Sequence, residues 1–413
     1  MKTILIVSMY NVSRKSHYEA ARRYGARLIL FMKNPTWERE YVDLAIDVDT
    51  ENLENTRKAV LELMKTEKID GVIPFTEHSV PAAAAAAHVL GVPFISEETA
   101  NICRNKYLMR KAFLERSIPC PKFEIAKTID EAKNICENFN YPIILKPLIG
   151  GGSLAVRRIN NEEELIYYFE ILQKMALEEF EYDPLYKRTI EEFGDSMLIE
   201  SYIPGKEVSV ESITVDGKTT ILAIHDKRLP MQGPYFEELY FSTPSLYNEE
   251  IKSKLCYLTK EANKALNIKI GATHTEFRID ELGNVIIVET GARIGGGGIY
   301  KSVLSSTGID MVDCIMDLSI GKKPKLDFIN AKPIGFYNFF SEGEGTIKDI
   351  KGLDEIRANE KLVELIMYKN IGDKVYMPPN SIAHGHFTVK GDTIDDVDKE
   401  VEKMLKTIKI ELV

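Results

Sequence analysis

The segment 272–298, ATHTEFRIDELGNVIIVETGARIGGGG, constrains the fold of this chain more than any other stretch. Two β-type runs flank a turn at Leu282-Gly283, and a symmetric hairpin about that turn places Glu276 opposite Glu289. Carboxylates paired in this way have Cβ atoms about 4.5–5.5 Å apart and repel each other unless a cation lies between them. A divalent cation that also contacts nucleotide phosphates is the natural occupant. The alternative is a shifted register with both glutamates in solvent, which the buried-type run IIV disfavours.

Arg293 and the glycines 295–298 follow this hairpin directly. The fixed fork of an arginine suits a carboxylate or a phosphate, and glycines let it approach a ligand closely. His274 lies two residues before Glu276 and therefore on the same strand face. We expect His274 to reach substrate or phosphate, and a structural hydrogen-bonding role is the alternative.

A second glycine-rich segment, PIILKPLIGGGSLAV at 142–156, reads as a buried strand that ends near Lys146 and continues into a loop. Backbone N–H groups in such a loop can approach phosphate oxygens because no Cβ interferes, while the lysine supplies charge. The loop residues are Gly150, Gly151, Gly152 and Ser153. Taken alone, this pattern also suits a flexible hairpin with a solvated lysine.

The segment 197–211, MLIESYIPGKEVSVE, predicts a strand that ends in Glu200, a turn at Pro204-Gly205, and a strand that carries Glu207 and Glu211. A carboxylate at the strand end can accept from an exocyclic amine, and one beyond the turn can accept from ribose hydroxyls. The alternative is an exposed hairpin with solvated acids.

The N-terminal part has the pattern of a parallel sheet with crossover helices, because short apolar runs at 2–8, 28–32 and 71–75 alternate with helical segments. Pro81, the alanines 82–87 and Gly91 predict one of these helices. The turn after the first strand reads SMYNVSRKSH and has no GxGxxG, so a bound NAD or FAD is disfavoured.

The remaining landmarks divide the chain into three parts, with an α/β domain at residues 1–100, an α+β domain at 101–325 and a β-rich closing subdomain at 326–413. The last part ends in a charged helix, DDVDKEVEKMLKTI. The only GKT, at 217–219, lacks the earlier glycine of a P-loop and predicts a hairpin turn.

Composition excludes several classes of function. The 413 residues carry 53 Lys and Arg against 63 Asp and Glu, a net charge of −10, whereas nucleic-acid binding needs the opposite balance. The five cysteines are scattered and form no CxxC pair, which favours a reducing cytosol. No stretch is typical of a membrane-spanning helix, and the apolar run after Lys2 lacks a signal-peptide cleavage site. We therefore expect a cytoplasmic protein with no nucleic-acid or membrane partner.

These motifs, in this order, resemble the ATP-grasp superfamily over nearly the whole chain. The resemblance implies an ATP-grasp fold, α/β and α+β, with a Rossmann-like N-terminal domain. It implies that Lys106 and Lys146 bind ATP phosphates and that 150–153 is the phosphate loop. It places the adenine hinge at Glu200, Tyr202 and Ile203, the ribose ligand at Glu207, and the magnesium ligands at Glu276 and Glu289. Where the family commonly has asparagine in ExNxR, this chain reads ETGAR, with Gly291.

Within the superfamily, GARIGGG and the segment 225–245, HDKRLPMQGPYFEELYFSTPS, look most like the L-amino-acid ligases that make dipeptides. Those ligases often have Gly-His in the middle of this segment, where this chain has Tyr240 and Phe241. The segment is too aromatic for a solvated loop. We expect it to cover the substrate site and the two rings to narrow the pocket, and packing of the rings in the core is the alternative.

The resemblance also implies a reaction. A carboxylate attacks the ATP γ-phosphate to form an acyl phosphate and ADP, and an amine then displaces phosphate. The implied catalytic residues are Arg293, Lys146 and His274, and the implied cofactors are ATP and Mg²⁺, as two ions for which Mn²⁺ can substitute. The partners are a small acid and a small amine, and a homodimer stays open. Alternatives are a purine-biosynthesis ligase, an ATP-dependent carboxylase and a regulatory ATP-binding protein without turnover.

Overall fold

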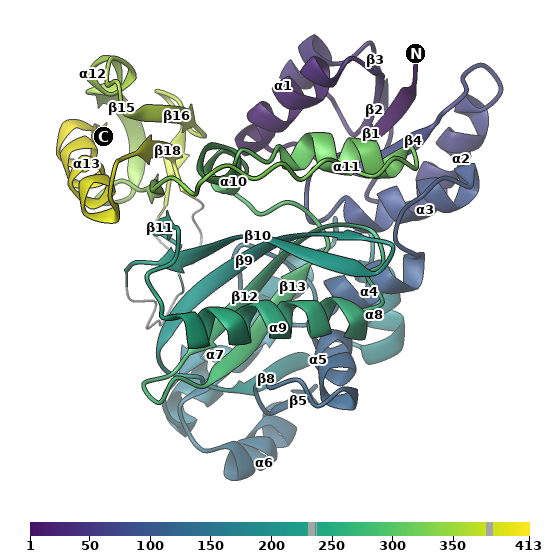
Figure 1. Ribbon diagram of the computed structural model, residues 1–413. Coiled ribbons are helices and arrows are strands. Elements are labelled where there is room, and N and C mark those ends of the chain that lie inside the picture. Colours follow the sequence, from purple (N-terminus) through teal and green to yellow (C-terminus); the bar gives the residue numbers. More distant parts are fainter. Residues whose placement is uncertain (230–235, 237, 377–382) are drawn as a thin grey trace.

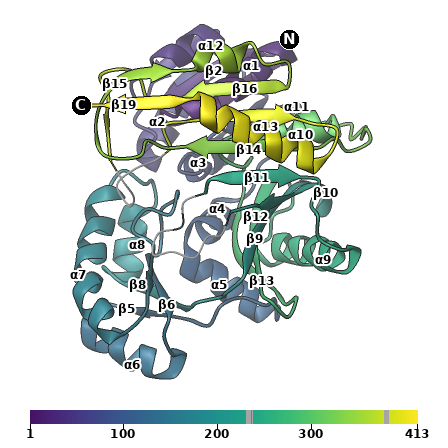
Figure 2. The same ribbon diagram turned by 90° about the vertical axis from the view of Figure 1, so that its left-hand side faces the viewer.

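The computed structural model describes residues 1–229, 236, 238–376 and 383–413. Within these residues the strands form four sheets. Figures 1 and 2 both show the N-terminal part, in purple, and the C-terminal part, in yellow, on the same side of the teal central part. The two ends of the chain therefore lie on one side of the central part.

The N-terminal part is a four-stranded parallel sheet in the order β3-β2-β1-β4. Its strands are β1 (Thr3–Val7), β2 (Arg27–Met32), β3 (Leu44–Asp47) and β4 (Gly71–Pro74). Its helices are α1 (Lys15–Tyr24), α2 (Leu53–Leu63) and α3 (Val80–Leu90). The three predicted strands and the alanine-rich helix are confirmed, whereas β3 is an additional strand.

The sheet is covered on both faces, as a Rossmann-like domain requires. Ile4 and Ile6 pack in the cluster that contains α1, while Leu5 and Val7 pack in the cluster with α2 and α3. This alternation follows from the period of two along a strand. It explains why each run reads as continuously apolar rather than alternating.

A small antiparallel sheet in the order β5-β8-β6-β7 carries the predicted phosphate loop between two of its strands. Its strands are β5 (Phe123–Ala126), β6 (Ile143–Pro147), β7 (Arg157–Ile159) and β8 (Met197–Ser201). The nearby helices are α4 (Glu97–Arg104), α5 (Lys106–Glu115), α6 (Ile129–Phe139), α7 (Glu162–Glu179) and α8 (Tyr186–Phe193).

An eight-stranded sheet in the order β13-β12-β9-β10-β11-β14-β18-β16 joins the central and C-terminal parts. Its strands are β9 (Lys206–Val215), β10 (Lys218–Lys227), β11 (Tyr240–Thr243), β12 (Gly271–Ile279), β13 (Val285–Gly291), β14 (Ile334–Phe339), β16 (Leu362–Met367) and β18 (Gly385–Lys390). The helix α9 (Glu249–Ala265) packs on it. Because β11 pairs with β14, the sheet continues across residue 326, where we expected a new subdomain to begin.

The turn between β9 and β10 confirms the predicted hairpin at GKT. Its two turn residues, Asp216 and Gly217, both have positive φ, 50° and 75°. Positive φ at both central residues is the geometry of the two-residue hairpin turn that Asp-Gly favours.

The C-terminal part also contains a three-stranded sheet, with β17 (Lys374–Val375), β15 (Gly345–Lys351) and β19 (Lys409–Leu412). Its helices are α12 (Leu353–Arg357) and α13 (Ile394–Thr407), and α13 is the predicted charged terminal helix. Two helices, α10 (Ile299–Thr307) and α11 (Met311–Ser319), share a core with the N-terminal sheet. Among the described residues, no helix is long and apolar enough to cross a membrane.

Candidate active site

The three parts of the chain meet at one cavity of about 630 Å³, which we call the central chamber. This volume is in the range of small-molecule sites. Residues from all parts line it, and they include every residue predicted for the site: Lys106, Lys146, Gly150, Gly151, Gly152, Ser153, Glu200, Tyr202, Ile203, Glu207, His274, Glu276, Glu289 and Arg293. Their roles remain predictions, but the fold brings them together from positions up to 187 residues apart.

The phosphate loop between β6 and β7 needs its glycines. Gly150 has φ of 127°, and a Cβ there would lie 2.5 Å from the Phe180 ring. Its carbonyl accepts from Lys106 Nζ at 3.4 Å and from Arg104 Nη1 at 3.2 Å. Lys106 begins α5, which Asn105 caps through the N–H of Leu108. The helix start therefore sets the lysine against the loop.

Lys146 and Glu200 form part of a buried ion cluster that the sequence did not predict. Lys146 Nζ lies 2.6 Å from Glu200 Oε2, and Arg110 Nε lies 2.7 Å from Glu200 Oε1. Burial would raise the pKa of Glu200, but Arg110 and Lys146 together lower it. Burial lowers the pKa of Lys146, and Glu200 opposes that shift. Both oxygens of Glu200 thus face cations, so the carboxylate orients Lys146.

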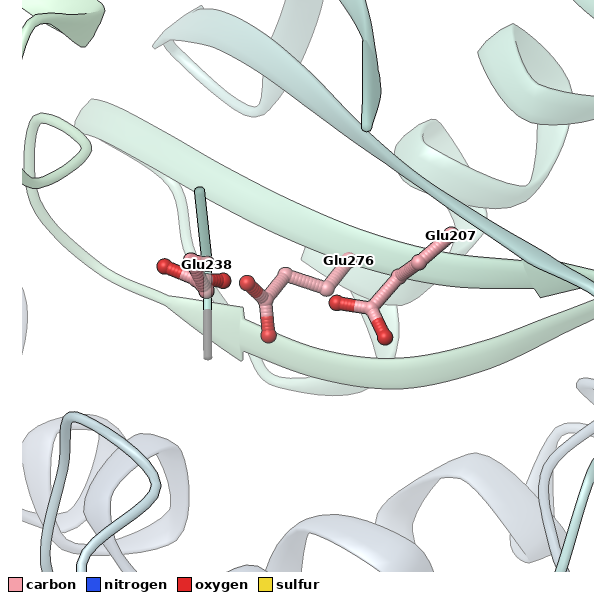
Figure 3. A group of neighbouring side chains, drawn as sticks. All are labelled: Glu207, Glu238 and Glu276. Atoms are coloured by element: carbon pink, nitrogen blue, oxygen red, sulfur yellow. The ribbon is translucent and has the colours of Figure 1, made fainter. Parts of the chain in front are cut away.

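Three glutamates on separate segments meet in the lining of the central chamber. One carboxylate oxygen from each of Glu207, Glu238 and Glu276 lies within 4.8 Å of the other two, a donor set that could hold a metal ion. Figure 3 shows the Glu276 carboxylate between the other two. Glu238 was not predicted as a ligand, because no local pattern in its segment brings it beside the two strands.

Lys227 offsets part of the negative charge of these three carboxylates. Its Nζ lies 2.9 Å from Glu276 Oε1 and also pairs with Glu207 and Glu238. Burial raises the pKa of Glu238 to about 7, with Lys227 opposing and Glu276 adding to the rise. Burial would also raise the pKa of Glu276, but Lys227 and His274 hold it well below its usual range.

The predicted pairing of the two hairpin glutamates is confirmed. Glu276 lies opposite Glu289 in the ladder between β12 and β13. A bulge follows, and nearer the turn the register shifts by one residue, so Phe277 faces Ile287. The two carboxylates have different cations, since Lys106 Nζ lies 3.2 Å from Glu289 Oε1.

His274 belongs to a buried hydrogen-bonded row. Its Nδ1 lies 2.6 Å from Glu211 Oε1 and its Nε2 lies 3.4 Å from Glu276 Oε1. Burial would lower the pKa of His274, but Glu211 raises it to about 9. The imidazolium therefore has a carboxylate on each side, which orients the ring toward Glu276.

Arg293 pairs through Nε with Glu77, an N-terminal residue that follows β4. Glu77 Oε1 also lies 3.2 Å from Arg104 Nη1, and Arg104 in turn pairs with the buried Asp183 at 2.5 Å. The sequence interpretation missed these partners. Glu77 carried a usable signal, because ligands bind at the carboxyl ends of parallel strands and Glu77 lies three residues beyond β4.

The predicted role of Tyr240 and Phe241 is wrong for the described structure. Both rings are buried, at 7% and 2% exposure, and neither lines the central chamber. Phe241 stacks on Phe336 with ring centroids 4.4 Å apart, and the Tyr240 hydroxyl donates to Asp398 at 2.5 Å. They point away because they sit on β11, whose faces are packed. Phe236 does line the chamber, and Tyr235 lies outside the described residues.

Family models match three stretches of the chain. The ATP-grasp N-terminal domain matches residues 18–94, the ATP-grasp domain matches 139–301, and the L-amino acid ligase C-terminal domain 2 matches 338–413. The order of the matches is the order of the three parts of the structure.

Similar proteins include an alanine–anticapsin ligase from Bacillus subtilis (strain 168), which is 28% identical over 281 residues. That alignment covers 65% of this chain and 58% of the ligase, so the chain spans a little more than half of that relative. An L-arginine-specific L-amino acid ligase from Bacillus subtilis is 23% identical over 372 residues, which cover 87% of this chain and 84% of the ligase.

Solved structures agree on the fold. An L-amino acid ligase from Bacillus licheniformis superposes with a TM-score of 0.85 at 23% identity and covers 100% of this chain and 99% of that one. A phosphoribosylglycinamide synthetase from Anaerococcus prevotii gives 0.75 at 20% identity, with full coverage of both chains. Together with the three family matches, this likeness confirms the expected fold, and the chain contains ATP-grasp domains followed by a C-terminal domain of the L-amino acid ligase type.

Proposed function

We propose that this protein is an ATP-dependent ligase that joins a carboxylate, in particular that of an L-amino acid, to an amine. The reaction passes through an acyl phosphate and releases ADP and phosphate. The observation that carries the proposal is that the two lysines, the glycine loop, the paired glutamates and Arg293 line one chamber. The similarity to an alanine–anticapsin ligase and to an L-arginine-specific L-amino acid ligase supports it.

Each group has a role in this reaction. Lys106 and Lys146 offset phosphate charge beside the glycine loop, and the backbone near Tyr202 and Ile203 receives the adenine. Arg293 holds the carboxylate and stabilises charge on its oxygen as the acyl phosphate forms. Catalysis is then mainly positioning and charge neutralisation, as in phosphoryl transfer generally.

Mg²⁺ belongs to the proposal, because oxygen ligands from several carboxylates suit this hard cation. Glu276 and Glu289 would hold it, with Glu207 and Glu238 within reach of Glu276. When bound, it would neutralise phosphate charge. We include two ions in the proposal, with Mn²⁺ as a substitute. A related carboxylase domain has been solved with MgADP, which supports this choice for the superfamily.

The products test this proposal directly. Mg-ATP is incubated with a matrix of paired L-amino acids, and phosphate release is measured. Chromatography of active mixtures should show ADP, and hydroxylamine should trap the activated acid as a hydroxamate. Formation of AMP and pyrophosphate, or the absence of any acid-dependent phosphate release, would contradict the acyl-phosphate mechanism.

The proposal extends to assembly and location. A related biotin carboxylase domain was solved as a dimer, so we include a homodimer, which light scattering of the purified chain tests. We also place the enzyme in the cytoplasm, because its five cysteines are all free in the structure and match a reducing compartment.

A further inference from the structure

Arg14 lines the central chamber from the N-terminal domain. It ends a short 3-10 helix, η1 (Val12–Arg14), in the glycine-free turn after β1. This turn lies at the carboxyl end of a parallel strand, the edge at which open α/β sheets bind ligands. The proposed nucleotide, metal and acid sites use no residue of this turn. The turn nevertheless lines the chamber, so we looked for a ligand that Arg14 could bind there.

In the part of the chain that the structure describes, the buried guanidinium of Arg14 has no anionic partner. The residue is 4% exposed. Its Nη1 donates to the Gly295 carbonyl at 2.7 Å and to His17 Nε2 at 3.1 Å, and its Nε has no hydrogen-bond partner within the described ranges. Among the described residues no carboxylate forms an ion pair with it. A buried charge with neutral partners alone is unfavourable, so an anionic ligand would complete the site.

The groups around Arg14 leave positive charge in excess. Arg293 lies near enough to oppose its charge, and burial with this repulsion lowers the pKa of Arg14 to about 9. Glu77 already pairs with Arg293 and Arg104. Burial, followed by the charge of Arg14, holds the pKa of His17 well below its usual range, so the ring is neutral and accepts from Arg14.

The described residues of the C-terminal part, 326–376 and 383–413, supply no ion-pair partner to Arg14 either. Tyr368 also lines the chamber and lies near enough to Arg14 to affect its charge. Glu364, on the neighbouring strand β16, is held by Ser16 and lies 3.0 Å from His386 Nε2. The acids near Arg14 are thus committed to other cations or donors.

We propose that Arg14 binds the free carboxylate of the amine substrate and so selects amines that carry a carboxylate. This inference rests on the proposed ligase function. The acid that is activated must lie beside Arg293 and the metal ligands, and its carboxylate is consumed. The carboxylate of the amine substrate persists as an anion through the reaction, which matches a guanidinium that stays charged and offers a planar fork.

Equilibrium binding tests the inference. Calorimetry with Mg-ADP present measures a panel of L-amino acids and their matched carboxamides against the wild-type protein and Arg14→Gln. We expect the wild type to favour the carboxylate about 10-fold to 100-fold, as one charge-assisted contact predicts. Arg14→Gln should reduce this preference to about 2-fold or less. Arg22→Gln is the matched control, because Arg22 is exposed on α1 and pairs with Asp43.

Other outcomes would overturn the inference. A wild-type protein that binds no amino acid, or that binds carboxylate and carboxamide equally, has no carboxylate site at Arg14. If Arg14→Gln lowers the affinities for the carboxylate, the carboxamide and Mg-ADP equally, Arg14 only stabilises the backbone at Gly295. If Arg14→Gln does not fold, the preference for carboxylate over carboxamide is measured in Arg14→Lys and in the wild type, and these two values decide. Hydroxamate formation by the wild type reports the ligase proposal separately, because hydroxylamine carries no carboxylate.

Discussion

Lys227 and Lys106 explain how a chamber with several carboxylates is stable without a ligand. Lys227 Nζ is within ion-pair distance of Glu207, Glu238 and Glu276, and Lys106 is within ion-pair distance of Glu289. Both lysines are buried, so water screens these ion pairs only weakly. At the scale of single residues, the site is therefore a group of carboxylates whose negative charge is offset in part by two buried lysines.

The paired hairpin glutamates should be essential to turnover. Glu276→Gln and Glu289→Gln each remove a metal-binding charge without removing volume, so activity should fall about 100-fold or more while the fold is kept. Phosphate release at saturating Mg-ATP measures this, with circular dichroism as the check on folding. Glu281→Gln, an exposed residue of the same hairpin, is the control. Near wild-type turnover in either variant would contradict the metal assignment.

His274 predicts a pH dependence of stability. Its pKa is raised from the ordinary histidine value to about 9, because Glu211 outweighs the effect of burial. The stabilisation is then complete below about pH 6.5 and is lost as the pH rises through about 9, a change of about 3 kcal/mol. Urea unfolding across this range measures it. His274→Gln should flatten the decline, whereas His88→Gln, exposed on α3, should leave it unchanged.

At the scale of elements, the packing around a loop or a strand decides what its glycines or its aromatic residues do. The loop between β6 and β7 needs positive φ at Gly150 and Gly152, but only Gly150 is closely packed. The strand β11 has aromatic residues like those of many pockets, yet its place between β10 and β14 makes both faces interior.

Gly150→Ala should therefore be more damaging than Gly152→Ala. A methyl group at 150 would lie 2.5 Å from Phe180. A methyl group at 152 would have no described atom within 4 Å apart from its neighbours in the chain. We expect Gly152→Ala to cost about 1 kcal/mol of backbone strain and Gly150→Ala about 2 kcal/mol or more, with a higher KM for ATP. Thermal unfolding and ATP kinetics measure the two variants. Equal effects would contradict the packing argument.

Phe241→Ala should behave as a core variant. It removes a ring stacked on Phe336, so the free energy of unfolding should fall by about 3–5 kcal/mol. The ranking of amino-acid substrates should stay the same, because Phe241 does not line the chamber. Phe236→Ala is the comparison, and it should alter the ranking. If Phe241→Ala changes the ranking of substrates over the amino-acid panel, Phe241 contributes to the substrate pocket and the core assignment is wrong.

At the scale of the whole molecule, the N-terminal domain is part of the site and of the core. It supplies Glu77 and Arg14 to the central chamber. Its sheet also packs against α10 and α11, which lie more than 200 residues further along the chain. Because the core crosses between the parts of the chain, it does not test the domain limits expected at 100 and 325, which remain a prediction.

A chain that begins at residue 101 should lose cooperative unfolding. Ile299, Val303, Met311 and Met316 are buried with residues of the N-terminal sheet, and removal of that sheet would expose them. Thermal unfolding followed by circular dichroism, with binding of a hydrophobic dye, compares this chain with the full one. A sharp transition at the temperature of the full chain would show that the core is not shared.

Local chemistry explains what the sequence alone could predict. The period of two, turn residues and helix caps are set by neighbours in the chain, so the parallel strands, the Asp-Gly turn, the terminal helix and the pairing of Glu276 with Glu289 were predictable. The motifs also indicated the family, because loops and strand ends that contact phosphate carry a fixed order of residue types.

Only the tertiary structure decided which charges meet. Glu238, Lys227, Arg110 and Glu77 join the site through contacts between strands and domains far apart in sequence, and no local pattern reports such contacts. The same holds for Phe241, since the faces of β11 are interior only because β14 completes the sheet. Arg14 follows this rule as well: its turn is local, but the absence of a carboxylate partner among the described residues is a property of the assembled chamber.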